Sequence, residues 1–383
     1  MSVFDELVGQ DDVIGTLQQA VEAARGEHTH GFTHAWLFTG PPGSGRSVAA
    51  RAFAAALQCP DGGCGHCSSC QTVRAGSHPD VDVVTPAGLS IGVAEARDIV
   101  LRSSMAPGRG GWQVVLLEDA DRLTEAAANA LLKAIEEPPP RGVFLLCVPS
   151  ADDLPPTIRS RCRLVRLRTP SAAAVAAQLV ARDGVDQAMA FFAARAAQGH
   201  VGRARRLATD EDARRQRHDA LKVPLELSSI GACLDVAHEL VEASKDESIR
   251  MTTPAAVAET AAMREAIGEG AGGKVKVRGT AGIMKDLERR QKSRETRSKR
   301  DVLDRALTDL AAFYRDVLLL QSGSAVPLIH SDLRDELTRV AGRSTPEATL
   351  RRVEAVLLCR ERIAANVDAL LAAEEMTLAL AAG

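Results

Sequence analysis

A glycine-rich loop between two apolar segments constrains the fold of this chain more than any other feature. The loop, Gly40–Ser47 (GPPGSGRS), follows the apolar run Ala35–Phe38 and precedes the Ala-rich run Val48–Leu57. This order predicts a strand, a phosphate-binding loop and a helix. Glycines let backbone N–H groups turn around a phosphate, and the helix N-terminus adds partial positive charge. The candidate phosphate-binding residues are Gly40, Gly43, Gly45, Arg46 and Ser47, with Arg46 at the position where such loops carry Lys.

Apolar runs alternate with helical patterns up to residue 168. Four further runs read as strands, and three amphipathic segments read as helices. The predicted strands are Val81–Val84, Trp112–Leu117, Gly142–Val148 and Arg163–Leu167. The predicted helices are Asp11–Arg25, with Asp11 or Asp12 as N-cap, Val93–Ser103 and Thr124–Glu136. Strands that alternate with helices indicate a parallel α/β sheet, which we place in residues 1–168.

The pattern after Pro170 is helical throughout. We expect a small helical lid at residues 169–210 and a second helical domain at residues 211–383. In that domain we predict long helices at Lys285–Leu320 and Thr345–Leu380. About residues 246–284 are weakly patterned, and their glycine-rich end predicts a mobile insertion.

Four cysteines lie within twelve residues, in the order Cys59-x4-Cys64-x2-Cys67-x2-Cys70. Four thiolates at this spacing are typical of a structural zinc site, so residues 59–70 form a predicted zinc module. Disulfides are the alternative, although reducing conditions inside cells and the two short Cys-x2-Cys steps disfavour them. We interpret His66 as a bystander, because four cysteines already complete a tetrahedral shell.

Two charged stretches have both a structural and a functional interpretation. Glu118 and Asp119 follow a predicted apolar strand. Carboxylates at this place hold Mg²⁺ in nucleotide hydrolases, and the alternative is that they cap a helix. The first half of the helix Lys285–Leu320 is rich in Lys and Arg. This half is either a solvated helix face or a contact for DNA or a partner.

Composition limits the class of protein. The net charge is -3 and the pI about 6.3, so any nucleic-acid contact has to be local or supplied by partners. No apolar run approaches the ~20 residues of a membrane helix, and the first residues lack the pattern of a signal peptide. We therefore expect a cytoplasmic protein without a membrane partner.

Several motifs together resemble one known family. They are Val8-Gly9-Gln10, His34–Gly40, the glycine loop, the four cysteines, Asn129–Pro138 and Ser160-Arg161-Cys162. With these motifs the chain resembles the bacterial AAA+ clamp-loader subunits of DNA polymerase III. The resemblance implies an α/β nucleotide-type domain, a helical lid and a helical collar. It also implies a heteropentamer of gamma/tau, delta and delta-prime subunits that opens the sliding clamp and places it on primer-template DNA.

The ATP-hydrolysing members of this family carry four motifs that bind or hydrolyse ATP, and this chain differs from them in all four. The loop Lys is Arg46, and the acidic pair is reversed to Glu118-Asp119. Val148-Pro149 replaces a polar sensor, and Gly202 stands where the lid Arg is expected. We therefore expect no ATP hydrolysis by this chain, while the sequence leaves the binding of ATP or ADP open.

Arg161 in the Ser-Arg-Cys motif keeps the family pattern. The resemblance implies that it acts in trans, as an arginine finger on the ATP of a neighbouring gamma/tau subunit. A chain with this Arg and without its own site resembles the delta-prime class, the stator of the ring. Three alternatives stay open: a purely structural Arg161, an ATP-hydrolysing gamma/tau-like motor, and a zinc-dependent nucleic-acid-binding protein.

Overall fold

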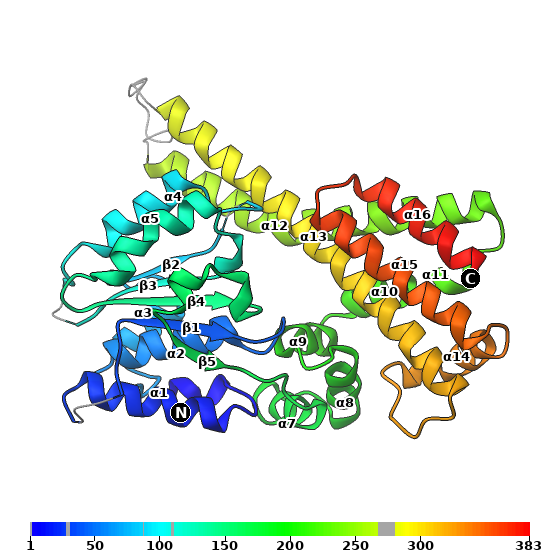
Figure 1. The fold of residues 1–383 in the computed structure, drawn as a ribbon, viewed down its shortest axis with the longest axis horizontal. Coiled ribbons are helices and arrows are strands. Elements are labelled where there is room, and N and C mark those ends of the chain that lie inside the picture. The colour runs from blue at the N-terminus through cyan, green and yellow to red at the C-terminus, as the bar shows by residue number, and fades with distance from the viewer. Residues whose placement is uncertain (1, 28–30, 87, 109–110, 267–279) are drawn as a thin grey trace. The chain divides into compact units, whose positions relative to one another are not determined.

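The computed structural model describes residues 2–27, 31–86, 88–108, 111–266 and 280–383. The chain forms two compact units, Met1–Thr209 and Asp210–Gly383 (Figure 1). No helix in these described stretches combines the length and the apolar character needed to cross a lipid bilayer.

The first unit contains a five-stranded parallel sheet in the order β2-β3-β4-β1-β5. β1, β3 and β4 are buried along their whole length, as expected for strands covered on both faces. The predicted α/β fold class is confirmed. The strands are β1 (Ala35–Thr39), β2 (Val81–Val84), β3 (Gln113–Leu117), β4 (Gly142–Val148) and β5 (Arg163–Arg166).

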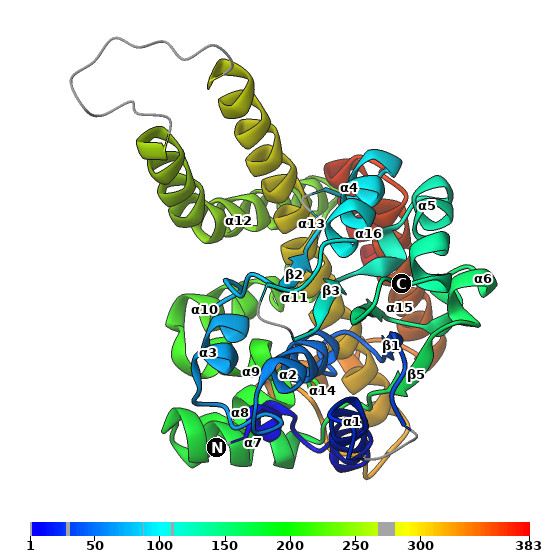
Figure 2. The same cartoon turned by 90° about the vertical axis from the view of Figure 1, so that its left-hand side faces the viewer.

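Helices cover both faces of this sheet, and each face has its own apolar core (Figure 2). One core contains Trp36 against Phe53, with ring centroids 4.9 Å apart, and packs α1, α2 and α3 on the sheet. The other packs α4, α5 and α6. These helices are α1 (Asp11–Ala24), α2 (Arg46–Gln58), α3 (Ser68–Arg74), α4 (Val93–Ser103), α5 (Glu125–Glu136) and α6 (Pro156–Arg159). Short 3-10 helices are η1 (Val3–Glu6), η2 (Ala120–Arg122) and η3 (Ala151–Asp153).

The parallel register brings the carboxyl ends of three strands to one edge of the sheet. Thr39 of β1 pairs with Val148 of β4, and Leu117 of β3 pairs with Leu146. The glycine loop, Glu118 and Pro149 each follow one of these strand ends. Three helices complete the unit after β5: α7 (Ala172–Asp183), α8 (Gln187–Ala196) and α9 (Val201–Thr209).

In the residues that the structure describes, the regular elements of the second unit are all helices. Its core is built on the C-terminal half of α13, where Leu307, Leu310, Phe313 and Val317 are fully buried. The elements are α10 (Glu211–Ala220), α11 (Val223–Glu226), α12 (Ile230–Ala266), α13 (Thr280–Gln321), η4 (Ser331–Leu333), α14 (Arg334–Ala341), α15 (Pro346–Ala364) and α16 (Ala369–Ala382).

Two expectations for this unit and one for the first unit were wrong in detail. Most of the segment predicted as a mobile insertion is helical, because residues 246–266 belong to α12 and residues 280–284 belong to α13. Residues 267–279 of that segment lie outside the described residues. The predicted helix Thr345–Leu380 is two helices. Asn366 adopts a left-handed φ of 69°, and Asp368 caps the next helix. In the first unit, the N-cap of α1 is Gln10, whose side chain is used elsewhere.

A buried aspartate–histidine pair in this unit leads to a pH prediction. Asp316 accepts hydrogen bonds from the backbone N–H (2.7 Å) and the ring Nδ1 (3.1 Å) of His330, and both side chains are fully buried. Burial raises the pKa of Asp316, but the bonds from His330 outweigh burial and hold this pKa below its usual value. A carboxyl with a lowered pKa in the folded state stabilises the fold above its unfolded pKa of about 3.9 and loses this effect in acid.

We therefore expect Asp316→Ala to lower the free energy of unfolding at pH 7 by about 3–5 kcal/mol, because it leaves buried partners unpaired. The difference from wild type should shrink as the pH falls below about 4. Denaturant titrations followed by circular dichroism at pH 7 and pH 3.5 measure both quantities, with exposed Asp335→Ala as the control. A destabilisation that is equal at the two pH values would contradict the role of the Asp316 charge.

Candidate functional site

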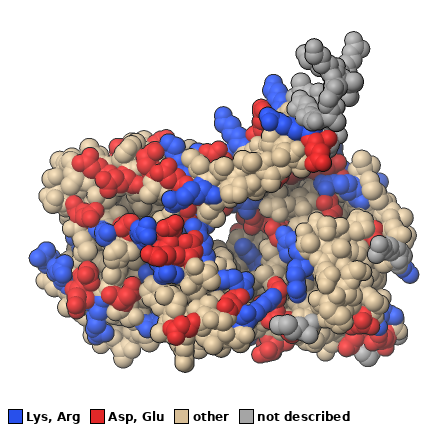
Figure 3. Space-filling model, turned by 180° about the vertical axis from the view of Figure 1, so that it is seen from behind, with Lys and Arg blue, Asp and Glu red and all other residues tan. Residues whose placement is uncertain are grey.

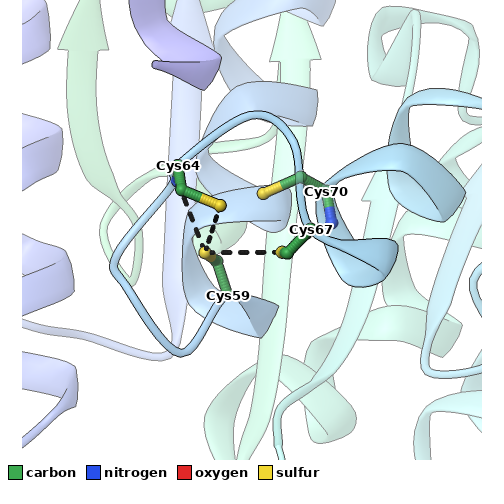
Figure 4. Close-up of side chains that lie close together, drawn as sticks. All are labelled: Cys59, Cys64, Cys67 and Cys70. Atoms are coloured by element: carbon green, nitrogen blue, oxygen red, sulfur yellow. Dashed lines mark hydrogen bonds between the residues drawn. The ribbon is translucent and has the colours of Figure 1, made fainter. Parts of the chain in front are cut away.

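The four cysteines form one cluster at the junction of α2 and α3 (Figure 4). Cys59 ends α2, Cys67 caps the N-terminus of α3, and Cys70 lies in its first turn. All four sulfurs lie within 4.8 Å of one another, with Cys59 Sγ 3.6 Å from Cys64 Sγ and 3.7 Å from Cys67 Sγ. A tetrahedral zinc ion with Zn–S bonds of about 2.3 Å needs sulfur pairs about 3.8 Å apart. The donor set therefore fits zinc.

The electrostatics of the cluster also suit a cation. Burial raises the pKa of Cys59, but the backbone N–H groups of Cys64, Gly63 and Asp61 stabilise its thiolate and lower this pKa to about 7. Burial raises the pKa of Cys70 well above its usual value. A buried thiol of this kind becomes a thiolate when a metal ion supplies the compensating charge. Metal binding at the cluster should therefore release protons.

Local backbone geometry explains how residues 59–70 turn tightly enough to bring four cysteine sulfurs together. Gly63 has a φ of 113°, and a Cβ there would lie 2.8 Å from Cγ2 of Val3. Its carbonyl accepts the backbone N–H of Val3 at 3.0 Å, so the knuckle packs on the N-terminal segment. His66 is exposed, and its Nδ1 lies 3.0 Å from the carbonyl oxygen of Cys64, outside the sulfur cluster.

The glycine loop connects β1 to α2 as the sequence predicts. Gly43 and Gly45 have φ values of 83° and 95°, which L side chains rarely adopt. Ser44 Oγ and Arg46 Nη1 are buried without a hydrogen-bond partner. Unsatisfied buried polar atoms at a helix N-terminus suit an anion such as a phosphate group, so the loop residues fit a nucleotide phosphate.

Glu118, which follows β3, is held by other residues of the same unit. Glu118 accepts a hydrogen bond from Arg51 Nε at 3.1 Å and one from Thr85 Oγ1 at 3.2 Å. Arg51 Nη2 also lies 3.1 Å from Glu118 Oε1. A carboxylate with these partners is not available for Mg²⁺ unless the ion pair with Arg51 opens. Asp119 adopts a left-handed conformation, with φ of 51°, at the start of η2.

Two further residues border the glycine loop. Pro149, which follows β4, has no polar side chain, and its carbonyl oxygen accepts the N–H of Gly40 at 3.1 Å. His200 packs directly on the loop, since a Cβ at Gly43 would lie 2.6 Å from its Cα. A Cβ at Gly202 would lie 3.5 Å from its Cε1, so the imidazole occupies the space beside the expected lid Arg position.

Arg161 lies after α6, away from the glycine loop in sequence, and is half-exposed. Its Nη1 donates to the carbonyl oxygen of Thr157 at 2.7 Å, and its Nη2 lies 2.5 Å from Glu136 Oε1. In the isolated chain the side chain is thus tied to its own domain at the surface, where surface ion pairs contribute about 0–1 kcal/mol. Such a weak contact can be exchanged for a stronger one.

Three residues of this site were not recognised from the sequence. Gln10 donates to the carbonyl oxygen of Arg168 at 2.6 Å and to that of Ser44 at 3.3 Å, so it ties the loop to the segment after β5. Arg51 and His200 are the other two. The only available signal was the Val-Gly-Gln motif at residues 8–10; nothing in the sequence pattern pairs Arg51 with Glu118.

The sheet order, the loop after β1 and the helical lid after β5 define a P-loop α/β protein of the AAA+ class. Residues 9–171 match the family model described as "DNA polymerase III, delta subunit". This part, less than half of the chain, is therefore similar to the DNA polymerase III subunit family, in agreement with the clamp-loader resemblance of the sequence motifs.

The relatives that are similar to this chain include both delta' and tau subunits of DNA polymerase III. The DNA polymerase III subunit delta' of Pseudomonas aeruginosa is 43% identical over 147 residues, 37% of this chain and 45% of that protein. The subunit tau of Bacillus subtilis is 37% identical over 164 residues, 42% of this chain and 28% of that protein. A solved gamma subunit-related protein from Thermotoga maritima covers 97% of this chain and 99% of its own, at 16% identity and a TM-score of 0.43. The chain spans less than half the length of the curated relatives it matches.

Proposed function

We propose that this chain is a delta-prime-like stator of a replicative clamp loader, which assembles with gamma/tau and delta subunits and does not hydrolyse ATP itself. The observation that carries the proposal is the state of Glu118. It is bound by Arg51 and Thr85 at the point where a motor subunit needs a free carboxylate. Pro149 and Gly202 support it, because neither has a side chain that can act on a phosphate. The expected place of such a protein is the cytoplasm.

Arg161 is the residue that we propose to act in catalysis, in trans on the ATP of a neighbouring gamma/tau subunit. Its half-exposed position and its weak surface partners, Glu136 and the Thr157 carbonyl, leave it able to reach a partner's anion. A triphosphate offers more negative charge than one carboxylate, so the exchange is favourable once a partner is docked.

The helical unit offers a surface for assembly. Leu350 and Leu357 of α15 are exposed seven residues apart, as are Leu371 and Leu378 of α16. Apolar side chains repeated at two-turn spacing on exposed helices are typical of helix–helix association. We propose that α15 and α16 contribute to the ring interface with the other subunits. The sliding clamp and primer-template DNA are partners of the whole complex.

We further propose that Cys59, Cys64, Cys67 and Cys70 bind structural Zn²⁺. Four thiolate ligands leave no position for water, so the ion would hold α2 and α3 together without taking part in a reaction.

The decisive test is ATP turnover by the purified chain, with a gamma/tau relative measured beside it. We expect no hydrolysis above the no-protein blank, because Glu118 is sequestered. Binding of labelled ADP without turnover is compatible with the proposal and should weaken in Arg46→Ala, since Arg46 Nη1 is buried at the loop without a partner. Hydrolysis by wild type that Arg46→Ala abolishes would instead establish the gamma/tau-like motor.

A further inference from the structure

The distal halves of α12 and α13, residues 244–266 and 280–300, form a helical hairpin that we call the arm (Figure 2). Residues 280–300 hold eight Lys or Arg and three Asp or Glu, a net charge of +5 within a chain of net charge -3. Neither the glycine loop, the cysteine cluster nor Arg161 uses this concentration of positive charge.

One side of α13 in the arm holds the two helices together. Arg294 forms a two-pronged ion pair with Glu259, with N–O distances of 2.7 and 2.8 Å. Gln291 donates to the carbonyl oxygen of Ala256 at 3.0 Å, and Ser248 donates to that of Glu295 at 3.2 Å. These bonds fix which face of α13 points toward α12.

A different side of α13 is almost purely cationic. At about 100° per residue, the helix places five basic residues and Thr296 within about 100° of arc, and no Asp or Glu shares that arc. The members are exposed or half-exposed, and blue side chains stand along the arm in Figure 3. One of them, Lys299, forms an ion pair with Glu295 at 2.7 Å, at the border of the arc. We call this set the basic face; its members are Lys285, Arg289, Lys292, Lys299 and Arg300.

We propose that the basic face binds the phosphate backbone of nucleic acid without sequence preference. It extends over about 22 Å, at about 1.5 Å per residue, and its neighbours repeat at three- and four-residue steps about 5–6 Å apart. A DNA strand presents one phosphate per about 3.4 Å of helix axis, so this length faces several phosphates. The face carries no aromatic side chain to stack on a base and no Asn or Gln to read an adenine, so the feature that all its charged members share is attraction to phosphate.

An acidic protein is the competing partner, and the observations favour it less. A protein interface needs a desolvated apolar centre, and the basic face has none. The groove of about 710 Å³ between α12 and α13 is more apolar, but it is lined by charges of both signs, including Glu288, Glu295 and Arg264. Lys292 borders both surfaces, and the other four members of the basic face lie outside the groove lining. A single-sign surface of Lys and Arg matches a polyphosphate better than this mixed groove does.

The test is binding of a labelled 20-base-pair duplex to the full chain across a salt series. In Lys285→Ala/Lys292→Ala/Arg300→Ala we expect the Kd at 100 mM salt to rise about 10-fold or more. The slope of log Kd against log salt should fall by about 2–3. A matched control, Arg334→Ala/Arg339→Ala/Arg343→Ala, removes the same charge from exposed positions off the arm and should bind as wild type.

Three results would overturn the proposal, and none depends on whether the chain is a stator or a motor. The first is an unchanged Kd in the arm variant. The second is an equal loss in the control variant, which would reduce the effect to net charge. The third is a polyglutamate peptide that binds the arm while the duplex does not, which would establish an acidic protein as the partner.

Discussion

Replacing Cys64 with serine is expected to abolish stoichiometric zinc binding and to destabilise the first unit more than any other single substitution considered for this chain. Free energies of about 10–16 kcal/mol are typical for structural zinc in small sites, and a large part is lost when one of four thiolates is removed. The sulfurs are already grouped within 4.8 Å, so three of them alone leave an open, weaker site.

The measurement is zinc content after dialysis, together with the thermal melting temperature with and without chelator. His66→Ala is the matched control, because His66 lies in the same knuckle and is exposed, and its Nδ1 lies 3.0 Å from the Cys64 carbonyl oxygen, outside the sulfur cluster. It should retain one zinc ion and the wild-type melting temperature. Unchanged zinc content in Cys64→Ser, or loss of zinc in His66→Ala, would show that the ligand set is different.

Replacing Arg161 with alanine is expected to leave the ring assembled but to slow hydrolysis at the neighbouring ATP site by about 10³–10⁵-fold, the range typical of arginine fingers. The reason is that a guanidinium aimed at the transferred phosphate stabilises charge that develops only in the transition state. DNA-stimulated single-turnover ATPase of the complex reconstituted with gamma/tau and delta measures the effect. Size-exclusion chromatography checks assembly.

Arg159→Ala provides the matched control, since Arg159 lies two residues earlier, is equally exposed and pairs with Asp152. It should keep wild-type turnover. Glu136→Gln separates the two interpretations of Arg161, because it removes the ion-pair partner but leaves the guanidinium free for a neighbour. If Arg161 is only structural, Arg161→Ala and Glu136→Gln should destabilise the chain alike and turnover by the assembled complex should not change.

Much of the first unit could be predicted from the sequence because its signals are local. The boundaries of β2, α4 and β4 follow from apolar runs and helical periodicity within a few residues. The glycine loop is recognisable because its glycines lie next to one another in the chain. The cysteine cluster is recognisable for the same reason, since spacing of two to four residues already restricts how the thiols can meet.

The arm was misjudged for a local reason as well. Ala, Thr and Gly leave residues 246–284 without a clear apolar stripe, so the hydrophobic pattern predicted no helix there. In the structure, α12 is stabilised by its packing against α13, through bonds such as that from Gln291 to Ala256, 35 residues away. Most helical stability in proteins comes from tertiary packing of this kind, which the pattern of one segment does not show.

The sequence by itself determined the fold class, the phosphate-type loop, the four-thiol cluster and the absence of a polar side chain at Pro149 and Gly202. Only the tertiary structure decided that Glu118 is held by Arg51, 67 residues away, and that His200 fills the space at Gly43. Parallel strands joined by long crossovers bring together groups that are far apart in the chain, and no local pattern specifies their pairing. The structure therefore shows what no local pattern could: the carboxylate that follows β3, Glu118, is paired with Arg51.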